Sequence, residues 1–199
     1  MGGDRSIVRT TSLIDVDNTL LDNDAAKVEL DRRLADLLGE PGNADFWAEY
    51  ETVRAEQGVV DIPRTIARTV AVLADRSVHR PLAELFMTFP FRDYIYPGAL
   101  ETLAFLRALG PVVILSDGDP VFQPVKIARS GLATVVDGYV LVFPHKDEHL
   151  PELVFVNRSA QAAIAVVTVP PFFNGRAFSL DFIFHQIKTR IEQFAQINL

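Results

Sequence analysis

The stretch Leu13-Ile14-Asp15-Val16-Asp17-Asn18-Thr19-Leu20 places two carboxylates directly behind a run of aliphatic residues. The segment from Ile7 to Ile14 is rich in β-branched residues, which is typical of a buried strand, and it ends abruptly at Asp15. At a spacing of two, one carboxylate can act as a nucleophile while the other exchanges a proton with a leaving group. The simpler alternative is an Asp-rich turn that caps the next helix.

The residues after this strand follow a helical pattern up to about Phe91. Apolar residues recur at helical spacing from Val28 to Leu38, and Gly39 is a candidate for the end of that helix. Further helical segments are predicted over residues 44–57, 62–74, 97–109, 127–136 and 181–197. Further strands are predicted over residues 112–115, 139–143, 153–156 and 164–169.

This order of elements predicts an α/β fold. A strand, a long helical insert, a helix and further strands indicate a Rossmann-like parallel sheet flanked by helices, with a helical cap inserted after the first strand. We predict that residues 1–21 and 92–199 form the α/β core and that residues 22–91 form the cap. The carboxyl ends of parallel strands lie at one edge of the sheet, so Asp15 and Ser116 are expected to meet there.

The composition restricts the possible classes of function. The 199 residues include no Cys, which excludes disulfide scaffolds, thiol nucleophiles and Cys-type metal sites. With 19 Lys and Arg against 26 Asp and Glu, the net charge of −7 argues against a nucleic-acid partner. We see no secretory signal at the polar start, and the longest apolar stretch, residues 162–173, is too short to span a membrane. We therefore expect a cytoplasmic protein without a membrane partner.

Two motifs, in this order, resemble those of the haloacid dehalogenase-like superfamily of phosphohydrolases. The first is a hydrophobic strand followed by Asp-x-Asp-x-Thr/Val, which residues 15–19 fit at each fixed position. The second is a strand that ends in Ser or Thr, which residues 112–118 fit after the helical insert. The segment from Tyr96 to Leu100 also resembles the helix entry of members with an inserted cap. The resemblance extends from about Ile7 to Leu150.

The resemblance implies a Mg²⁺-dependent hydrolase of a small phosphorylated molecule that acts through an aspartyl-phosphate intermediate. Asp15 would be the nucleophile and a Mg²⁺ ligand. Asp17 would be the general acid and base, with its carbonyl also on the metal. The dehalogenating branch typically lacks the second Asp, so Asp17 indicates a phosphate substrate. The remaining substrate-binding candidates are Thr19, Ser116, Asp117, Gly118 and Lys126.

A third motif of the family supplies a Lys that neutralises charge on the nucleophile and the phosphoryl group, and two residues compete for it. Lys146 follows the strand predicted over residues 139–143 and lies 30 residues beyond Ser116, which suits the family, so we favour it. Lys126 lies only 10 residues beyond Ser116, inside a predicted helix, where a solvated side chain is the simpler interpretation. Lys126 could still contact an anionic substrate.

The fourth motif, one or two Asp after a strand, is missing. The strand predicted over residues 164–169 runs into Pro170 and Pro171, whose side chains offer no oxygen ligand to Mg²⁺. Asp181 is a candidate for a displaced ligand, although a helix N-cap is its simpler role. This divergent last quarter could reflect natural drift, a chimera or a shifted reading frame. The alternative function is therefore a catalytically impaired relative with a binding or self-association role, and the Phe-rich tail is a candidate homodimer surface.

Other polar and aromatic residues are weaker candidates. His145 and His149 have the spacing of a metal-binding pair, but Pro144 and the charged neighbours favour a solvated loop or the start of a helix. Three aromatic residues of the insert are predicted as cap core rather than substrate wall, and three arginines as surface residues. These residues are Phe46, Trp47, Tyr50, Arg54, Arg64 and Arg68.

Overall fold

A four-stranded parallel sheet lies at the centre of the computed structural model, which describes residues 10–149 and 163–167. The strands are β1 (Thr10–Ile14), β2 (Val112–Asp117), β3 (Val140–Phe143) and β4 (Ala163–Val167), in the order β3-β2-β1-β4. Each adjacent pair is parallel. The strand predicted over residues 153–156 and the helix predicted over residues 181–197 lie outside the described residues.

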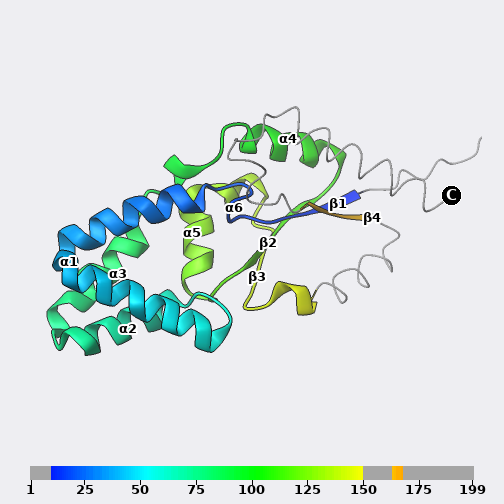
Figure 1. Cartoon of the computed structure of the whole chain (residues 1–199). Coiled ribbons are helices and arrows are strands. Elements are labelled where there is room, and N and C mark those ends of the chain that lie inside the picture. Colours follow the sequence, from blue (N-terminus) through cyan, green and yellow to red (C-terminus); the bar gives the residue numbers. More distant parts are fainter. Residues whose placement is uncertain (1–9, 150–162, 168–199) are drawn as a thin grey trace, which may run out of the picture.

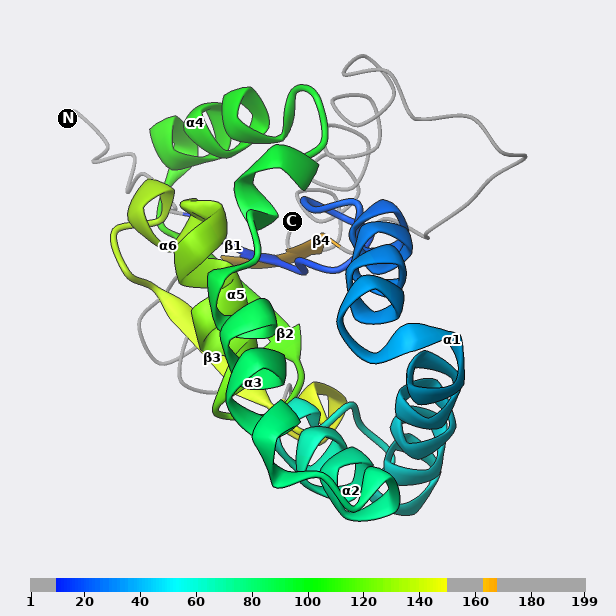
Figure 2. The same cartoon turned by 90° about the vertical axis from the view of Figure 1, so that its left-hand side faces the viewer.

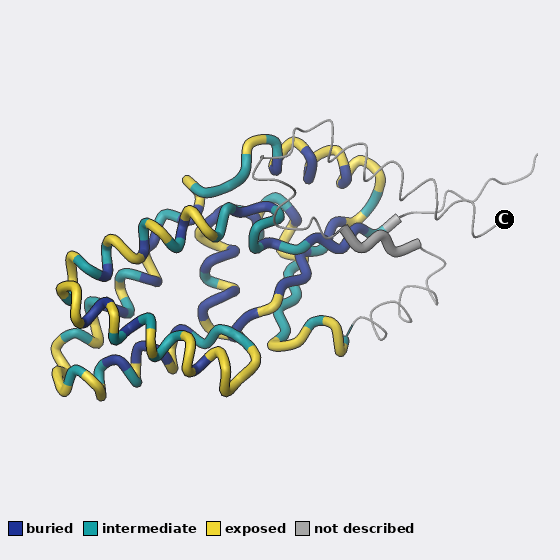
Figure 3. The backbone as a smooth tube through the Cα atoms, viewed as in Figure 1, coloured by how far each residue is buried: buried dark blue, intermediate teal, exposed yellow. Residues whose placement is uncertain are grey.

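The two central strands are buried along most of their length (Figure 3). Leu13 and Ile14 of β1 and Ile114 and Leu115 of β2 are all almost inaccessible to solvent. Successive side chains of a strand point to opposite faces, so burial of adjacent residues means that both faces of the sheet are covered. This is the pattern of a parallel sheet between helices, and it confirms the predicted fold class.

Helices make up most of the rest of the described chain. The insert between β1 and β2 contains α1 (Asn23–Gln57), α2 (Ile62–Leu73), the 3-10 helix η1 (Arg76–Val78) and α3 (His79–Thr88). The elements that follow are η2 (Phe91–Tyr94), α4 (Ala99–Leu109), α5 (Phe122–Ser130) and α6 (Leu132–Val135). Among the described residues, no helix combines the length and the apolar character needed to cross a bilayer.

The inserted helices lie beyond the carboxyl ends of the strands (Figure 1). In Figure 2, α1 and α3 lie on opposite sides and α2 lies across their far end. Phe86 of α3 stacks on Phe46 of α1, with ring centroids 5.4 Å apart, and meets Phe122 of α5 edge-on at 5.7 Å. These aromatic contacts join the insert to the α/β core. Residues 24–91, all of them described, contain no strand, in agreement with the predicted helical insert.

The strand order places the end of β1 at a change of direction in the sheet. The chain passes from β1 outward through β2 to β3, and β4 then lies on the other side of β1. Ligands of open α/β sheets bind outside the carboxyl ends of the strands at such a point. The register sets Ile14 level with Ile114 and with Val167, so Asp15 leaves the sheet close to the end of β2.

The first helical arm of the insert ends at Gly39, as predicted, and a second arm of α1 follows at once with a kink between the two. Gly39 has a φ of 71°, a conformation that favours glycine, and the helix resumes at once through Pro41. We predicted a new helix from residue 44, so the second arm starts earlier than expected. Proline is tolerated here because the first turn of a helical arm leaves its N–H groups unpaired. The bend brings Asn43 and Trp47 to Asp31, to which both donate hydrogen bonds, at 2.9 and 2.7 Å.

Two boundaries near the site also differ from the prediction. β2 extends two residues further than predicted, so Ser116 and Asp117 belong to the strand. α5 begins at Phe122, before the predicted start at residue 127. The carboxylate of Asp119 explains the earlier start, since it accepts hydrogen bonds from the N–H groups of Val121 and Phe122 at 2.9 and 2.6 Å. An acceptor at this position satisfies N–H groups that a helix start leaves unpaired.

Leu103 and Leu109 of α4 provide a test of the packing of this helix. Leu103 is fully buried, whereas Leu109 is 45% exposed. Leu103→Ala is expected to lower the free energy of unfolding by about 2–5 kcal/mol, because it leaves a cavity in the core. Leu109→Ala, the control, should change it by no more than about 0.5 kcal/mol. Urea denaturation measures both values, and equal losses would contradict this packing.

Candidate active site

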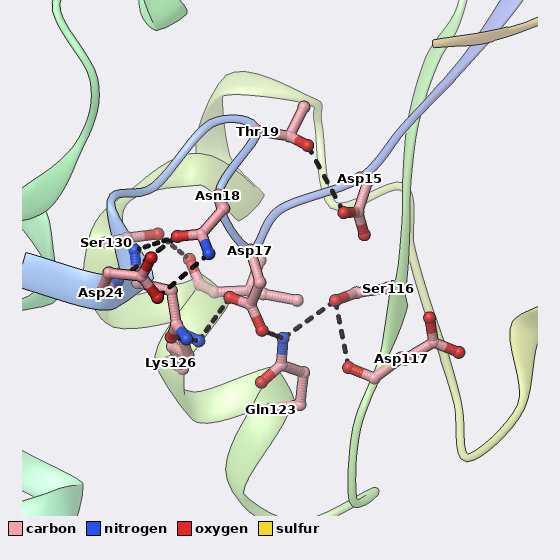
Figure 4. Close-up of polar contacts among 12 residues, drawn as sticks. Asp15, Asp17, Asn18, Thr19, Asp24, Ser116, Asp117, Gln123, Lys126 and Ser130 are labelled. Carbon is pink, nitrogen blue, oxygen red and sulfur yellow. Dashed lines mark hydrogen bonds and ion pairs between the residues drawn. The ribbon is translucent and has the colours of Figure 1, made fainter. Parts of the chain in front are cut away.

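The loop after β1 holds Asp15 and Asp17 in defined positions. Val16 between them is fully buried, and its carbonyl accepts hydrogen bonds from the N–H groups of residues 19–21 at 2.9–3.1 Å. Neighbouring side chains of an extended segment point to opposite sides, so burial of Val16 leaves both carboxylates on the other side. Figure 4 shows the two carboxylates beside the end of β2.

Asn18 connects this loop to the start of α1. Its φ of 56° is a left-handed conformation that Asn adopts more readily than most residues. Its side-chain oxygen accepts hydrogen bonds from the N–H groups of Asn23 and Asp24, at 2.9 and 3.3 Å. Asp22 adds an N-cap by accepting from the N–H of Ala25 at 2.9 Å. The position of the loop is therefore coupled to the position of the first inserted helix.

Lys146 is the cationic partner of Asp15. Its Nζ lies 2.8 Å from Asp15 Oδ1 and 3.1 Å from Asp117 Oδ2, and its backbone N–H donates to Asp117 Oδ1 at 2.8 Å. The hydroxyl of Thr19 donates to Asp15 Oδ2 at 3.4 Å. Of the two lysines that competed for the place beside Asp15, Lys146 occupies it.

Burial and ion pairing act in opposite directions on this pair. Burial raises the pKa of Asp15 above its ordinary value, and Lys146 reduces this shift without cancelling it. Burial alone would lower the pKa of Lys146, but the hydrogen bonds and charges of Asp15 and Asp117 outweigh burial and raise it. Lys146 therefore remains a cation beside the Asp15 carboxylate at neutral pH.

Two residues of α5 hold Asp17. Lys126 forms an ion pair with Asp17 Oδ1 and donates to Asn23 Oδ1 at 2.7 Å. Gln123 Nε2 donates to Asp17 Oδ2 at 3.1 Å (Figure 4). The side chain of Lys126 is only 5% exposed, so the expected solvated position is wrong. A spacing of three places Gln123 and Lys126 on one face of α5, and this face packs toward the β1 loop.

Gln123 is the residue of this site that the sequence analysis missed. Besides Asp17, its amide donates to Ser116 Oγ at 2.8 Å, and thus links the β1 loop to the end of β2. The hydroxyl of Ser116 in turn donates to the carbonyl of Asp117 at 3.3 Å. The sequence does show that Gln123 lies three residues before Lys126 and so on the same face of a helix. This spacing points to a role for Gln123 only once the face of α5 that carries Lys126 is known to be buried.

Gly118 allows α5 to approach the end of β2 closely. Its φ is 151°, and its N–H donates to the carbonyl of Phe143 at 3.1 Å. A Cβ at this position would lie 2.8 Å from both Cβ and Cγ of Gln123, closer than carbon atoms can pack. Glycine at position 118 is therefore required for the position of Gln123.

Asp119 lies where α5 meets the insert. Burial raises the pKa of Asp119, and hydrogen bonds from Phe122 and Val121 reduce the shift. The backbone of Ile62, at the start of α2, also acts to lower this pKa. Asp119 thus accepts hydrogen bonds from the start of α5 and lines the cavity together with Ile62 of the insert.

A cavity of about 340 Å³ opens between the insert and the core. Its volume falls within the range of small-molecule sites. The core contributes Asp17, Asp117, Gly118, Asp119, Phe122, Gln123, Lys126, Pro144 and His145. The inserted helices, the loop between α1 and α2, and η2 contribute Asn23, Lys27, Leu30, Trp47, Tyr50, Gly58, Val59, Val60, Ile62, Phe86 and Phe91. Asp17 therefore faces a space that a small molecule can enter.

The predicted aromatic cluster of the insert divides between two roles. Phe46 is fully buried in the core, as predicted. Trp47 and Tyr50 pack against the core cluster, as predicted, and also line the cavity. Phe46 therefore serves the core alone, whereas Trp47 and Tyr50 belong both to the packing of the insert and to the cavity wall.

The arginines of the insert lie in surface positions. Arg54 pairs with Glu51 at 3.5 Å and Arg68 pairs with Glu56 at 2.8 Å. Arg64 is exposed to solvent. These positions agree with the surface role that we predicted for them.

The histidines near the site pack against neighbours. The ring of His145 lies 2.9 Å from the position that a Cβ on Gly58 would take. His149 stacks on Phe143, with ring centroids 4.1 Å apart. Within residues 10–149 and 163–167, no three His, Asp or Glu side chains form a group that could hold a metal ion. Asp181 and the segment that contains Pro170 and Pro171 lie outside the described residues.

The parallel sheet, the inserted helices and the two lysine-bound carboxylates define a class of α/β hydrolases. A family model of haloacid dehalogenase-like hydrolases matches residues 11–152, and the chain belongs to this family. The match confirms the resemblance inferred from the two sequence motifs. A comparison with curated proteins gives no match.

Solved structures of the same family resemble this chain. A haloacid dehalogenase-like hydrolase from Burkholderia xenovorans is 37% identical, with a TM-score of 0.72 over 81% of this chain and 74% of that chain. A haloacid dehalogenase-like family hydrolase from Xanthomonas campestris is 16% identical, with a TM-score of 0.55 over 84% of this chain and 76% of that chain. The second similarity concerns the fold alone.

Gly118→Ala tests the close approach of α5 to β2. Both the steric contact with Gln123 and the positive φ act against alanine, so we expect a loss of about 2–5 kcal/mol in the free energy of unfolding. Gly131→Ala is the matched control, because Gly131 has a φ of 83° but no atom within 4 Å of the added Cβ. The control should lose only about 1–2 kcal/mol. Similar losses in urea denaturation would show that Gly118 is not sterically constrained.

Proposed function

We propose that the chain is a Mg²⁺-dependent phosphohydrolase that cleaves a small phosphorylated molecule through an aspartyl-phosphate intermediate. The observation that carries this proposal is the different environment of the two carboxylates at the end of β1. Asp15 is held by Lys146, whereas Asp17 lines the cavity. This difference suits a nucleophile and a proton donor. A halide leaves without a proton, so a proton donor at the cavity supports an alcohol leaving group over dehalogenation.

In the first step, an oxygen of Asp15 attacks the phosphorus atom, and the bond from phosphorus to the ester oxygen breaks. Asp17 donates a proton to that oxygen, so the leaving group departs as a neutral alcohol. Lys146, 2.8 Å from Asp15, offsets the negative charge that gathers when the two anions approach. Ser116 and the backbone N–H groups that follow β2 are candidates to bind the phosphoryl oxygens.

In the second step, water attacks the phosphorus atom of the aspartyl-phosphate. Asp17 accepts a proton from this water, and the bond between phosphorus and Asp15 breaks. Inorganic phosphate leaves, and Asp15 is restored as a carboxylate. Gln123 and Lys126 position Asp17 in both steps, because they bind one carboxylate oxygen each.

The end of β1 offers oxygen donors of the kind that Mg²⁺ prefers. The carboxylate of Asp15 and the backbone carbonyl of Asp17 would hold the ion. When bound, Mg²⁺ offsets charge on the phosphoryl group. Pro170 and Pro171 follow β4 where the family's fourth motif has Asp, so phosphate and water oxygens would complete the shell.

Pro170 and Pro171 also support a second candidate function. A chain that lacks the fourth motif could be a catalytically impaired relative that keeps the first half of the site and binds a phosphorylated ligand without turnover. The Phe-rich region after residue 150, which holds seven of the 14 Phe, would then serve self-association. Turnover by the wild-type protein decides between the two candidates.

Asp15→Asn and Asp17→Asn test the covalent mechanism. Asp15→Asn should abolish phosphate release from an alkyl phosphate while the fold is retained, because the amide keeps the shape but is not a nucleophile. Asp17→Asn should slow turnover by about 10²–10⁴-fold, since an alkoxide leaves poorly without a proton. Circular dichroism controls for folding. Near-normal turnover by Asp15→Asn would remove the covalent mechanism, and an inactive wild-type protein would support the impaired relative.

Mg²⁺ binding should depend on phosphate. The missing Asp residues remove negative charge from the site, so the free protein is expected to bind Mg²⁺ weakly. Inorganic phosphate supplies further oxygen ligands and should strengthen Mg²⁺ binding by about tenfold or more, a normal size for coupling between two ligands. Titration calorimetry with and without phosphate measures the difference. Tight binding by the phosphate-free protein would contradict this prediction and would indicate that Asp181 or another carboxylate completes the site.

A further inference from the structure

One lysine that lines the cavity between insert and core, Lys27, has its carboxylate partner beyond hydrogen-bond distance. Lys27 and Lys126 are the lysines that line it in the described part of the chain. The ammonium of Lys126 already donates hydrogen bonds to Asp17 and Asn23. Lys27 forms an ion pair with Glu51, whose oxygen lies 3.9 Å from Nζ, beyond hydrogen-bond distance. The ammonium of Lys27 is therefore available to a closer anion.

Two aromatic rings fix the position of this ammonium. Nζ of Lys27 lies 4.7 Å from the ring centroid of Trp47 and 4.8 Å from that of Tyr50. Both distances are typical of cation–π contacts. The Trp47 ring is held in turn, because its Nε1 donates to Asp31 at 2.7 Å. The cation and both rings thus form a preorganised group on the insert side of the cavity.

Tyr50 adds a neutral hydroxyl to this group. Burial raises the pKa of Tyr50 to about 12, so the phenol keeps its proton at neutral pH. A neutral phenol can donate a hydrogen bond to an anion, as the ammonium can. Lys27 and Tyr50 together therefore offer one positive charge and donors of two kinds.

The other walls of the cavity determine what could connect this group to the reacting centre. Asp17 lies on the core side, where the leaving oxygen of a substrate would sit under the proposed mechanism. The inserted helices, η2 and α5 add apolar walls to the same cavity: Leu30, Phe86, Phe91 and Phe122. A ligand that reaches from Asp17 to Lys27 would therefore have an apolar body and an anionic far end.

We infer that Lys27, Trp47 and Tyr50 form a subsite for a carboxylate on the leaving group, so that the substrates are phosphate esters of small hydroxy acids or phenolic acids. This inference rests on the proposed phosphohydrolase function. One lysine matches the single charge of a carboxylate better than the double charge of a second phosphate. The three aspartates in the cavity wall, Asp17, Asp117 and Asp119, also disfavour a second dianion in this space.

Matched substrates test the subsite. 4-Carboxyphenyl phosphate and 4-methylphenyl phosphate have similar shapes and differ in the charge at the far end. Lys27→Met should lower kcat/KM for the carboxylate ester by about 10- to 100-fold, the loss expected for a hydrogen bond to a charged group. For the methyl ester, kcat/KM should change by less than about twofold, because no charge is lost from its contacts. Lys27→Arg should restore most of the preference.

Arg64→Met is the control for removal of a positive charge. Arg64 is an exposed cation of the insert, so its loss should affect both esters equally and only slightly. If Lys27→Met lowers kcat/KM for both esters by the same factor, or for neither, the carboxylate subsite is wrong while the phosphohydrolase proposal stands.

Binding without turnover provides a second measurement. Trp47 is the only Trp of the chain, so its fluorescence reports on the subsite directly. 4-Carboxybenzylphosphonate and 4-methylbenzylphosphonate cannot be hydrolysed. We expect the carboxylate compound to change the fluorescence and to bind at least about tenfold more weakly to Lys27→Met. Such binding in a protein that cleaves neither ester would support the subsite and reject the phosphohydrolase proposal. Equal affinity of Lys27→Met and wild type for the carboxylate compound would overturn the subsite.

Discussion

Two carboxylates only two residues apart at the end of a buried strand need cations from elsewhere in the chain. Lys146 reaches Asp15 across 131 residues, and Lys126 reaches Asp17 across 109 residues. The rest of the site follows from these two ion pairs. Lys146 also binds Asp117 at the end of β2, and Lys126 brings α5 against the β1 loop. Removal of either lysine leaves a partly buried charge unpaired, a change that typically destabilises a protein by several kcal/mol.

The ion pair of Lys126 with Asp17 also connects the core to the insert. Lys126 donates to Asn23, the first residue of α1, as well as to Asp17. Asn18, in the same loop as Asp17, accepts hydrogen bonds from the first N–H groups of that helix. A rotation of α1 about its start would therefore change the contacts of Asp17. The same helix carries Lys27 and Trp47, which line the cavity. The position of α1 therefore affects both the Asp17 carboxylate and this part of the cavity wall.

Much of the fold could be predicted because its signals are local. A run of aliphatic residues before Asp15, the helical spacing of apolar residues up to Phe91 and a second apolar strand before Ser116 are sufficient to predict a parallel α/β sheet with an insert. The position of Lys146 beside Asp15 was predictable for a related reason. Residues that follow parallel strands lie at one edge of the sheet, whatever their separation in the sequence. The end of the first helical arm at Gly39 was also predictable, but the immediate start of the second arm was not, since a proline two residues after a glycine can stand in a loop or in the first turn of a new helix.

The sequence alone determined the class of protein, the strand ends that carry the carboxylates and the lysine that follows β3, because motif spacing and hydrophobic pattern are properties of short segments. Only the tertiary structure decided the surroundings of Asp17. Lys126 reads as a solvated helix residue and Gln123 carries no motif, yet both face the β1 loop because α5 packs with that face inward. Trp47 and Tyr50 likewise line the cavity because of how their helix, α1, packs in the tertiary structure. Which face of a helix is buried depends on what packs against it, and packing partners distant in the sequence leave no local trace.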